Sequence, residues 1–208
     1  MGQIILASAS PRRKELLEQI GISFEVCPAK GEEMITSTLP SAVVSELSAQ
    51  KAREVAGMLK QYGDSHRELM TPQDMMVLGA DTVVSVDNQI LGKPKNEADA
   101  ARMLRMLSGR THEVYTGVTI VLMSKSGKAG EHTFYEKTAV TMREMSDEEI
   151  ERYVATGEPM DKAGAYGIQG KCAIYIDKIE GDYNNVVGLP VSAIYHVLKN
   201  LGIDWYLW

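Results

Sequence analysis

Apolar runs, and stretches in which apolar and polar residues alternate, predict the strands of this chain. Residues 3–7 are largely apolar, which is typical of a short buried strand, and residues 22–28 alternate as a half-buried strand does. The longest apolar run, residues 75–86, is interrupted by Gly79-Ala80-Asp81-Thr82, and the Asp87-Asn88 turn after it predicts a hairpin. Together these patterns predict strands at residues 3–7, 22–28, 75–86, 89–91, 114–124, 133–142 and 173–179.

Apolar residues at helical spacing, together with capping residues, predict the helices. Ser10 stands at an N-cap position with Pro11 at the first helical position, and Gly21 ends the helix that follows. Ser146 and Glu149 have the spacing of a capping box, in which each side chain bonds the other residue's backbone N–H. The predicted helices span residues 11–20, 40–62, 97–108, 147–156 and 190–201.

The order of these elements predicts the fold class. Helices and strands mix without strict strand–helix–strand alternation, which favours an α/β protein with a mixed central β-sheet flanked by helices over a doubly wound sheet. Polar or glycine-rich residues predict loops at 63–74, 125–130 and 157–170. With 208 residues and no internal repeat or linker, the chain is expected to form a single domain, 1–208, of two lobes that share one cleft.

The composition is that of an ordinary globular protein, with 44% hydrophobic and 24% charged residues. A formal charge of −6 argues against a nucleic-acid partner, which normally meets a basic face, but allows a small anionic substrate held by local cations. No apolar run approaches the roughly 18 residues of a membrane span, and the N-terminus lacks the basic segment of a signal peptide. We therefore expect a cytoplasmic protein with no membrane partner, in which Cys27 and Cys172 are buried reduced thiols.

The segment after the first strand is the first candidate for chemistry. Two hydroxyls, of Ser8 and Ser10, and two guanidinium groups, of Arg12 and Arg13, gather at the start of a predicted helix. Free backbone N–H groups at a helix N-terminus bind anions, and arginine suits phosphate in particular. The alternative is a solvated basic helix start without a ligand, whose charge repulsion costs a few tenths of a kcal/mol.

Asp81 is the second candidate, because it stands in the middle of an apolar strand. A buried carboxylate is costly unless it is paired or bound to a metal. Gly79 and Ala80 just before it would let another part of the chain approach the backbone closely. The alternative is a structural role, in which Asp81 accepts hydrogen bonds from nearby backbone N–H groups.

Scattered carboxylates and lysines form a third candidate set. Glu32 and Glu33 follow the second predicted strand, Lys51 lies on the long helix, and Lys93 follows the hairpin. Carboxylates together with lysines suit Mg²⁺ and a polyphosphate, because the metal prefers hard oxygens and lysines act as point charges. Each residue taken singly is better explained as a solvated surface charge, so this set depends on the fold bringing its members together.

The fourth candidate is the glycine-rich segment 161–170, in which Gln169 could read the edge of a base with both a donor and an acceptor. A turn-rich connection without a ligand is the alternative. The sequence contains no G-x-x-x-x-G-K-[ST], H-E-x-x-H, G-x-S-x-G or paired C-x-x-C motif. Its histidines lack metal-ligand spacing and are interpreted as ordinary surface or core residues: His66, His112, His132 and His196.

Taken in order along the chain, these segments resemble the Maf family of nucleoside triphosphate pyrophosphatases. The resemblance runs nearly end to end and is carried by Ser8-Ala9-Ser10-Pro11-Arg12-Arg13, Glu33, Lys51-Ala52, Gly79-Ala80-Asp81-Thr82, Gly92-Lys93-Pro94, Leu107-Ser108-Gly109, residues 161–170 and Val187-Gly188-Leu189-Pro190. It implies a mixed α/β fold similar to that of inosine triphosphate pyrophosphatases, with two lobes around a nucleotide cleft. It also implies hydrolysis of a nucleoside triphosphate to the monophosphate and pyrophosphate, with a divalent cation, Mg²⁺ or Mn²⁺, as cofactor.

The resemblance also implies roles for the matched residues. Asp81 is expected to act as general base or metal ligand, Glu33 to complete the metal site, and Lys51 to pair with Glu33 or with phosphate. Substrate-binding roles are expected for Ser8, Ser10, Arg12, Arg13, Lys51, Thr82, Lys93 and Gln169.

Three positions indicate a branch of the family. Arg12, Thr82 and Gln169 are as in the branch that acts on dTTP and UTP, and the 7-methyl-GTP branch typically differs at all three. Thr82 and Gln169 are expected to distinguish pyrimidine from purine by hydrogen bonds to the base. Two departures from many relatives, Cys172 in place of Gly and a longer loop after Tyr62, lie outside the matched catalytic positions.

Three other functions remain open from the sequence. A 7-methyl-GTP or modified-pyrimidine triphosphate is the main rival substrate. A nucleotide-sensing regulator of cell division is the rival from a different class, and it requires binding without turnover. A nucleic-acid-binding module is disfavoured by the charge of −6. The family resemblance also implies a homodimer as one expected assembly.

Overall fold

The computed structural model describes residues 2–65, 74–124 and 129–207, which build one mixed seven-stranded sheet. The strand order is β2-β1-β3-β5-β6-β7, and β4 pairs with β3 alongside this path. β1 runs parallel to β2 and β3, whereas the other neighbouring strands pair antiparallel. The mixed central sheet predicted from the sequence is therefore confirmed. The strands are β1 (Gln3–Leu6), β2 (Glu25–Val26), β3 (Met75–Val86), β4 (Gln89–Leu91), β5 (Thr111–Met123), β6 (Ala129–Met142) and β7 (Ile176–Glu180).

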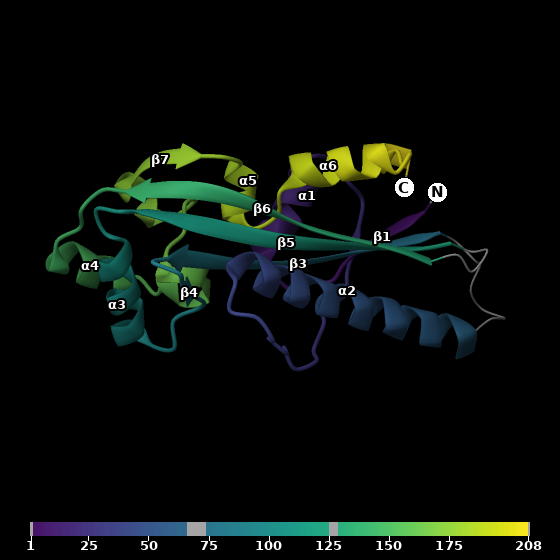
Figure 1. The fold of residues 1–208 in the computed structure, drawn as a ribbon, viewed down its shortest axis with the longest axis horizontal. Helices are drawn as coiled ribbons and strands as arrows, with labels where there is room; N and C mark the ends of the chain where they lie inside the picture. The colour runs from purple at the N-terminus through teal and green to yellow at the C-terminus, as the bar shows by residue number, and fades with distance from the viewer. Residues whose placement is uncertain (1, 66–73, 125–128, 208) are drawn as a thin grey trace.

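Helices cover both faces of this sheet (Figure 1). The longest, α2, lies along one face against β3 and β5, and α1 and α6 lie on the opposite face. None of the helices in the described segments is long and apolar enough to cross a membrane. The helices are α1 (Pro11–Gln19), α2 (Pro40–Ser65), α3 (Glu97–Leu107), α4 (Asp147–Val154), α5 (Tyr183–Val187) and α6 (Val191–Asn200), with short 3-10 turns at Glu158–Asp161, Ala163–Ala165, Lys171–Tyr175 and Trp205–Leu207.

The hydrophobic core divides at Asp81 and Thr82 in the middle of β3. Before them, alternate residues point to opposite faces of the sheet, so that Leu78 packs with α1 and α6 and Val77 packs with α2. After them, Val84 joins a separate buried cluster with residues of α3 and α4. Two half-buried polar residues therefore lie between two apolar clusters, where a cleft can form.

Two glycines bring α2 into contact with the sheet. A Cβ atom on Gly79 would lie 2.3 Å from the Ser48 carbonyl oxygen, and one on Gly117 would lie 2.2 Å from the Val44 carbonyl oxygen. Only glycine fits at either position, because helix backbone meets strand backbone there. The close approach expected at Gly79 is thus confirmed, with α2 as the approaching group. It brings Lys51 on α2 next to Asp81 on β3.

Several predicted strand boundaries are wrong, and backbone pairing explains each. The predicted strand 22–28 shrinks to Glu25–Val26, the two residues that pair with Ile5 and Leu6 of β1. The predicted strand 75–86 has the bounds of β3, and Gly79–Thr82 interrupt only its apolar pattern, since every residue from Met75 to Ser85 pairs with β5.

Pairing also lengthens or replaces other predicted elements. The polar residues Thr111–Glu113 extend β5, since they pair with the end of β6, and β6 begins at Ala129 rather than at residue 133. The start of the predicted strand 173–179 is a 3-10 turn, and β7 follows it. The long helix continues to Ser65, three residues past its predicted end, whereas the predicted loop residues 66–73 and 125–128 lie outside the described residues. The short helix α5 was not predicted.

The two cysteines are free thiols, as expected. Cys172 is fully buried, and burial raises the pKa of its thiol to about 12. Cys27 was expected to be buried, but it is only partly buried.

Candidate active site

The start of α1 is built as an anion-binding terminus. Ser10 is the N-cap residue and Pro11 occupies the first turn, as predicted, but within the described chain the Ser10 side chain makes no capping hydrogen bond. The buried Ser8 hydroxyl instead accepts a hydrogen bond from the Ser10 backbone N–H at 3.2 Å. Because no side chain caps the turn and cationic residues follow, the terminus attracts an anion.

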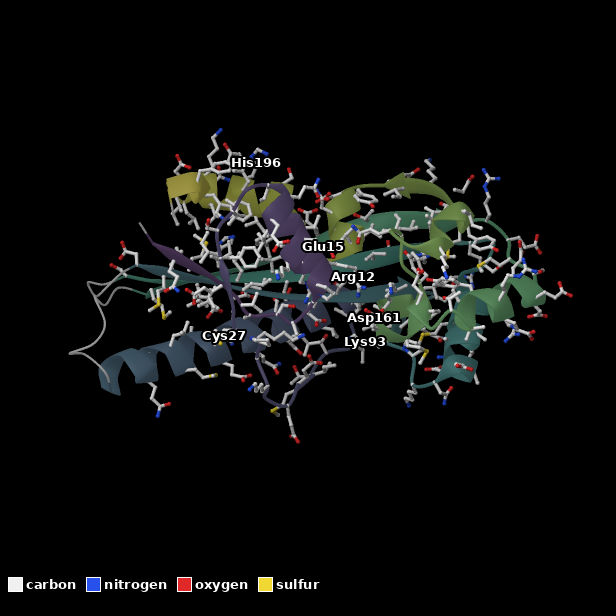
Figure 2. The ribbon with its side chains drawn as sticks, turned by 180° about the vertical axis from the view of Figure 1, so that it is seen from behind. Arg12, Glu15, Cys27, Lys93, Asp161 and His196 are labelled. Carbon is white, nitrogen blue, oxygen red and sulfur yellow. The ribbon has the colours of Figure 1, made fainter. Side chains whose placement is uncertain are left out.

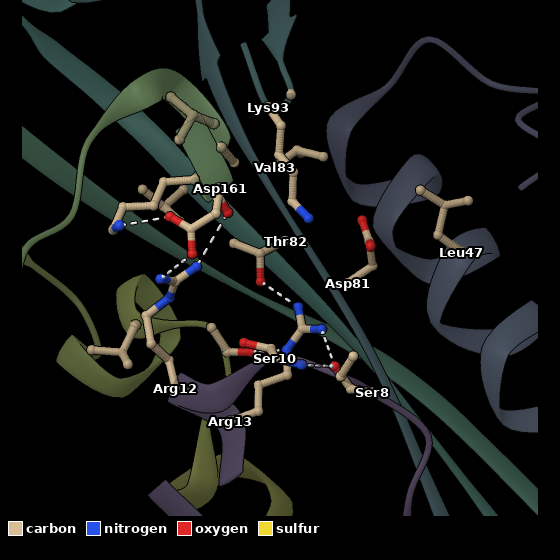
Figure 3. Close-up of a pocket in the computed structure, with 18 of the residues that line it drawn as sticks. Ser8, Ser10, Arg12, Arg13, Leu47, Asp81, Thr82, Val83, Lys93 and Asp161 are labelled. Atoms are coloured by element: carbon tan, nitrogen blue, oxygen red, sulfur yellow. Dashed lines mark hydrogen bonds and ion pairs between the residues drawn. The ribbon is translucent and has the colours of Figure 1, made fainter. Parts of the chain in front are cut away.

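Arg13 is buried and held by three parts of the fold (Figure 3). Its Nε donates to the Gly188 carbonyl at 2.8 Å, one Nη to Ser8 Oγ at 2.9 Å, and the other Nη to Thr82 Oγ1 at 3.0 Å. Burial lowers the pKa of Arg13, and the nearby Asp81 carboxylate acts against that shift. Three of the five N–H donors of this guanidinium are therefore used to join α1 to β3 and to the residues after α5.

Thr82 belongs to a chain of hydrogen bonds in which each donor can be assigned. Its hydroxyl accepts from Arg13 and lies 2.9 Å from the Thr116 hydroxyl. Thr116 donates its own proton to the Asn185 carbonyl at 2.9 Å, so it accepts from Thr82. The Thr82 proton is thus already committed, and only a lone pair of its oxygen is free for a ligand. In this geometry Thr82 orients Arg13.

Lys51 holds two carboxylates together on the other side of the cleft. Its Nζ lies 2.5 Å from Asp81 Oδ1 and 2.8 Å from Glu33 Oε1. The Asp81 and Lys51 side chains are 15% and 19% exposed, whereas Glu33 is 52% exposed. The ion pair with Lys51 offsets the cost of burying the Asp81 carboxylate. Asp81 also lines the cavity.

Arg12 lies at the mouth of the site against the glycine-rich segment. It donates to Asp161 Oδ2 at 3.1 Å and to the Asp161 carbonyl at 3.3 Å, and Lys162 Nζ lies 2.7 Å from the second carboxylate oxygen. Partial burial raises the pKa of Asp161, but the hydrogen bond from Lys162 and the charge of Arg12 outweigh it, so the net shift is downward. Seen from behind, Arg12, Asp161 and Lys93 lie together, away from Cys27 and His196 (Figure 2).

One cavity of about 830 Å³ collects these groups. Lys93 points into it toward the space beside Asp81 and Thr82 (Figure 3). The Gly164 N–H donates to the Gly92 carbonyl at 3.0 Å, which ties the Lys93 segment to the glycine-rich loop. Every site residue named from the sequence lines this cavity: Ser8, Ser10, Arg12, Arg13, Glu33, Lys51, Asp81, Thr82, Lys93 and Gln169. Glu32, weighed beside Glu33, is not part of the lining.

Two features of the site gave no signal in the sequence. The first is the pairing of Arg12 with Asp161, which joins residues 149 positions apart. The second is a set of apolar residues that line the cavity and were not singled out as site residues: Ile35, Val43, Leu47, Val83 and Ile90.

The residues present fit a divalent cation bound together with phosphate. No group of three or more His, Cys, Asp or Glu side chains lies together in the described part of the chain. Asp81 and Glu33 nevertheless supply two hard oxygen donors on one side of the cavity. Mg²⁺ is commonly held by one or two carboxylates, with substrate phosphates and waters as its other ligands. The donor set therefore suits Mg²⁺ or Mn²⁺ better than a metal that needs a full protein cage.

The family model described as Maf-like protein matches residues 3–201. This chain belongs to the Maf-like family. A curated relative, the dTTP/UTP pyrophosphatase of Agathobacter rectalis, is 67% identical over 204 residues, which cover 98% of this chain and 100% of that protein. The dTTP/UTP pyrophosphatase of Lachnoclostridium phytofermentans is 50% identical over 204 residues, with 98% of each chain covered. The family resemblance inferred from the motifs is thus confirmed.

Solved structures of low sequence identity also align with this Maf-like chain. A HAM1 protein from Coxiella burnetii is 18% identical, with 96% of this chain and 100% of that chain covered and a TM-score of 0.49. A nucleoside-triphosphatase from Mycobacterium abscessus, described as a dITP/XTP pyrophosphatase, is 17% identical, with 97% and 96% covered and a TM-score of 0.40.

Proposed function

We propose that this chain hydrolyses nucleoside triphosphates, preferentially dTTP and UTP, to the monophosphate and pyrophosphate. One observation carries the proposal: a paired carboxylate, Asp81, shares a cavity with Lys51, Arg12 and Lys93 at the N-terminus of α1. Carboxylate and cations in this arrangement suit the cleavage of a phosphoanhydride. The preference for dTTP and UTP is supported by the names of relatives that are 67% and 50% identical to this chain.

The phosphate chain is held by the cations at the cavity mouth. Arg12 is 25% exposed and paired with Asp161, so it can exchange that carboxylate for a phosphate without unfolding any element. Lys93, which follows β4, points into the same cavity. The uncapped N-terminus of α1 adds backbone N–H donors. These groups stabilise the charge that develops on the pyrophosphate leaving group.

Asp81 is the residue that directs the attack of water on the α-phosphorus. Lys51 fixes one oxygen of its carboxylate at 2.5 Å, and the other is free to accept a proton from water or to bind a cation. Glu33, brought to the same ammonium, is the second carboxylate of the proposed metal site. Bound there, Mg²⁺ or Mn²⁺ would neutralise phosphate oxygens and activate water.

The base is read by the glycine-rich loop in this proposal. Gln169 lines the cavity and offers a donor and an acceptor, which an unmatched base would leave unpaired at a cost in binding. Because the Thr82 proton is committed to Thr116, Thr82 supports Arg13, and Gln169 carries the larger share of base selection.

A pyrophosphate-release screen over common and modified nucleoside triphosphates, with and without Mg²⁺ or Mn²⁺, tests this function. We expect metal-dependent release that is fastest with dTTP and UTP. Faster release from 7-methyl-GTP or from a modified pyrimidine triphosphate would identify that nucleotide as the preferred substrate instead. Nucleotide binding without release would favour a nucleotide sensor. The expected cytoplasmic location and homodimer stay predictions that this screen does not address.

A further inference from the structure

The segment that carries Glu33 has almost no support from the core. We call residues 28–39 the strap; they run beneath the N-terminal half of α2 in Figure 1. The strap has no helix or strand, and its residues from 30 to 36 are all exposed, Met34 and Ile35 by 69% and 54%. Within the described chain, no backbone–backbone hydrogen bond joins residues 28–38 to the sheet or to a helix. Ordering such a segment costs backbone entropy, so other contacts must hold it.

Three side chains of α2 make those contacts. Glu54 accepts from the Lys30 N–H at 2.8 Å and from the Gly31 N–H at 3.1 and 3.2 Å. Glu46 accepts from the Thr36 N–H at 2.9 Å and the Thr36 hydroxyl at 2.7 Å. The third is Gln50, which lies between the other two along the helix.

Gln50 makes two hydrogen bonds to the backbone of Met34, the residue after Glu33. Its Oε1 accepts from the Met34 N–H at 2.9 Å, and its Nε2 donates to the Met34 carbonyl at 2.5 Å. Glu46, Gln50 and Glu54 are four residues apart, so they lie on one stripe of the helix, and each reaches backbone rather than another charge. We call these three residues the α2 stripe. A Cβ atom on Gly31 would lie 2.8 Å from Glu54 Oε2, so the strap is also shaped for this close contact.

Lys51 follows Gln50 directly and binds Glu33 from inside the cavity. Two consecutive residues of α2 therefore hold the strap: Gln50 bonds the backbone of Met34, and Lys51 pairs with the side chain of Glu33. A rigid helix that fixes both points sets the position of the Glu33 carboxylate relative to Asp81.

We propose that Gln50, supported by Glu46 and Glu54, is a positioning residue that holds Glu33 at the cation side of the active site. This rests on the proposed function for its catalytic consequence, but the ordering of the strap by the α2 stripe does not. Removing the Gln50 contacts is expected to free the strap, withdraw Glu33 from Lys51 and weaken the use of Mg²⁺, while the phosphate-binding cations stay in place.

The test compares Gln50→Leu, which keeps the size of the side chain but makes no hydrogen bond, with Gln50→Glu, which keeps the acceptor for the Met34 N–H. Arg53→Gln is the matched control, because Arg53 lies on the same helix but pairs with Glu131 of β6. Hydrogen exchange of strap amides is measured without nucleotide or metal. We expect faster exchange at Met34 and Thr36 in Gln50→Leu, a smaller change in Gln50→Glu and none in Arg53→Gln. Unchanged exchange in Gln50→Leu would overturn the proposal.

The second measurement is the Mg²⁺ concentration that gives half the maximal rate of pyrophosphate release from dTTP. Residues that support metal ligands typically change metal affinity about 10–100-fold, so we expect a rise of about tenfold in Gln50→Leu. The KM for dTTP at saturating Mg²⁺ should stay unchanged. A general loss of stability would lower the maximal rate without shifting the Mg²⁺ requirement. An unshifted Mg²⁺ requirement with freed strap amides would overturn the positioning role. If the wild type releases no pyrophosphate, the proposed function fails, and hydrogen exchange alone decides whether the α2 stripe orders the strap.

Discussion

The ammonium of Lys51 lies 2.5 Å from the carboxylate of Asp81, between α2 and β3. It also pairs with Glu33, so it sits against the two carboxylates that we propose for the cation. Lys51 and a divalent cation therefore compete for the same negative charge when no phosphate is present.

Replacing Lys51 by Met should remove this competition. Gln50 still holds the strap in Lys51→Met. We therefore expect this variant to bind Mg²⁺ alone more tightly than the wild type, because the two carboxylates lose their internal partner, and to release pyrophosphate more slowly. Thermal unfolding in rising Mg²⁺ without nucleotide measures the first effect, since ligand that binds only the folded state raises the unfolding temperature. Equal stabilisation of both proteins by Mg²⁺ would contradict the competition.

Substitution of Arg13 should mainly lower the stability of the fold, whereas substitution of Arg12 should mainly weaken substrate binding. Arg13→Gln breaks three hydrogen bonds of a buried charged group and takes this donor from the Gly188 carbonyl, so we expect a loss of about 3 kcal/mol in the free energy of unfolding. Arg12→Gln removes only a partly exposed ion pair, so its loss should stay below about 1 kcal/mol while the KM for dTTP rises. Urea unfolding and steady-state kinetics on both variants check this, and equal loss of stability in the two would refute the division.

Glu158 should control the shape of the glycine-rich loop. Its carboxylate accepts from the Tyr153 hydroxyl at 2.9 Å and the Lys171 N–H at 3.1 Å, and a Cβ atom on Gly170 would lie 2.0 Å from it. Glu158→Gln turns one acceptor into a donor, which should cost about 1–3 kcal/mol and loosen the loop that carries Gln169.

The expected kinetic result for Glu158→Gln is a higher KM for dTTP and a smaller preference for dTTP over a purine triphosphate. Glu151→Gln, an exposed change on α4, is the control. The ratio of kcat/KM for the two substrates is the measurement, and an unchanged ratio would show that this carboxylate does not shape base selection.

His112 should make the fold sensitive to acid. It is buried beside the Tyr166 hydroxyl, 2.7 Å from its Nε2, and burial lowers the pKa of His112 to about 4. The unfolded chain takes up a proton below the ordinary value of 6.5 while the folded chain does not, so stability falls as the pH drops from 6.5 to about 4. A shift of this size corresponds to a loss of about 3 kcal/mol.

Urea unfolding of the wild type and of His112→Gln at pH ~7 and pH ~4 measures this contribution. We expect the wild type to lose more stability than the variant over this range, since glutamine keeps a hydrogen-bonding group at Tyr166 but does not titrate. The same loss in both proteins would assign the acid sensitivity to other groups.

The sequence predicted those features that depend on local pattern. β3 is a strongly apolar strand, and the single carboxylate in it, Asp81, proved to line the cavity. Gly79 indicated a close backbone contact, which α2 makes. The capping box at Ser146 was predicted in full, because all of its groups lie within four residues.

Features that depend on pairing between distant segments were not predictable in the same way. Polar residues Thr111–Glu113 are strand residues only because β6 lies opposite them. The strap shows neither helix nor strand periodicity in the sequence, and its order comes from a helix stripe whose side chains look like ordinary surface residues. The hydroxyl of Thr82 was expected to contact the base; in the fold it donates its proton to Thr116 and accepts a hydrogen bond from Arg13.

Pyrophosphate release from dTTP by the wild type and by Asp81→Asn, at saturating Mg²⁺, tests the central claim most directly. Asparagine keeps the size of the side chain, and thermal unfolding verifies that the variant is folded. We expect metal-dependent release by the wild type and a rate about a thousandfold lower in Asp81→Asn, because a proton-accepting carboxylate is removed. A folded Asp81→Asn variant as fast as the wild type would contradict this claim.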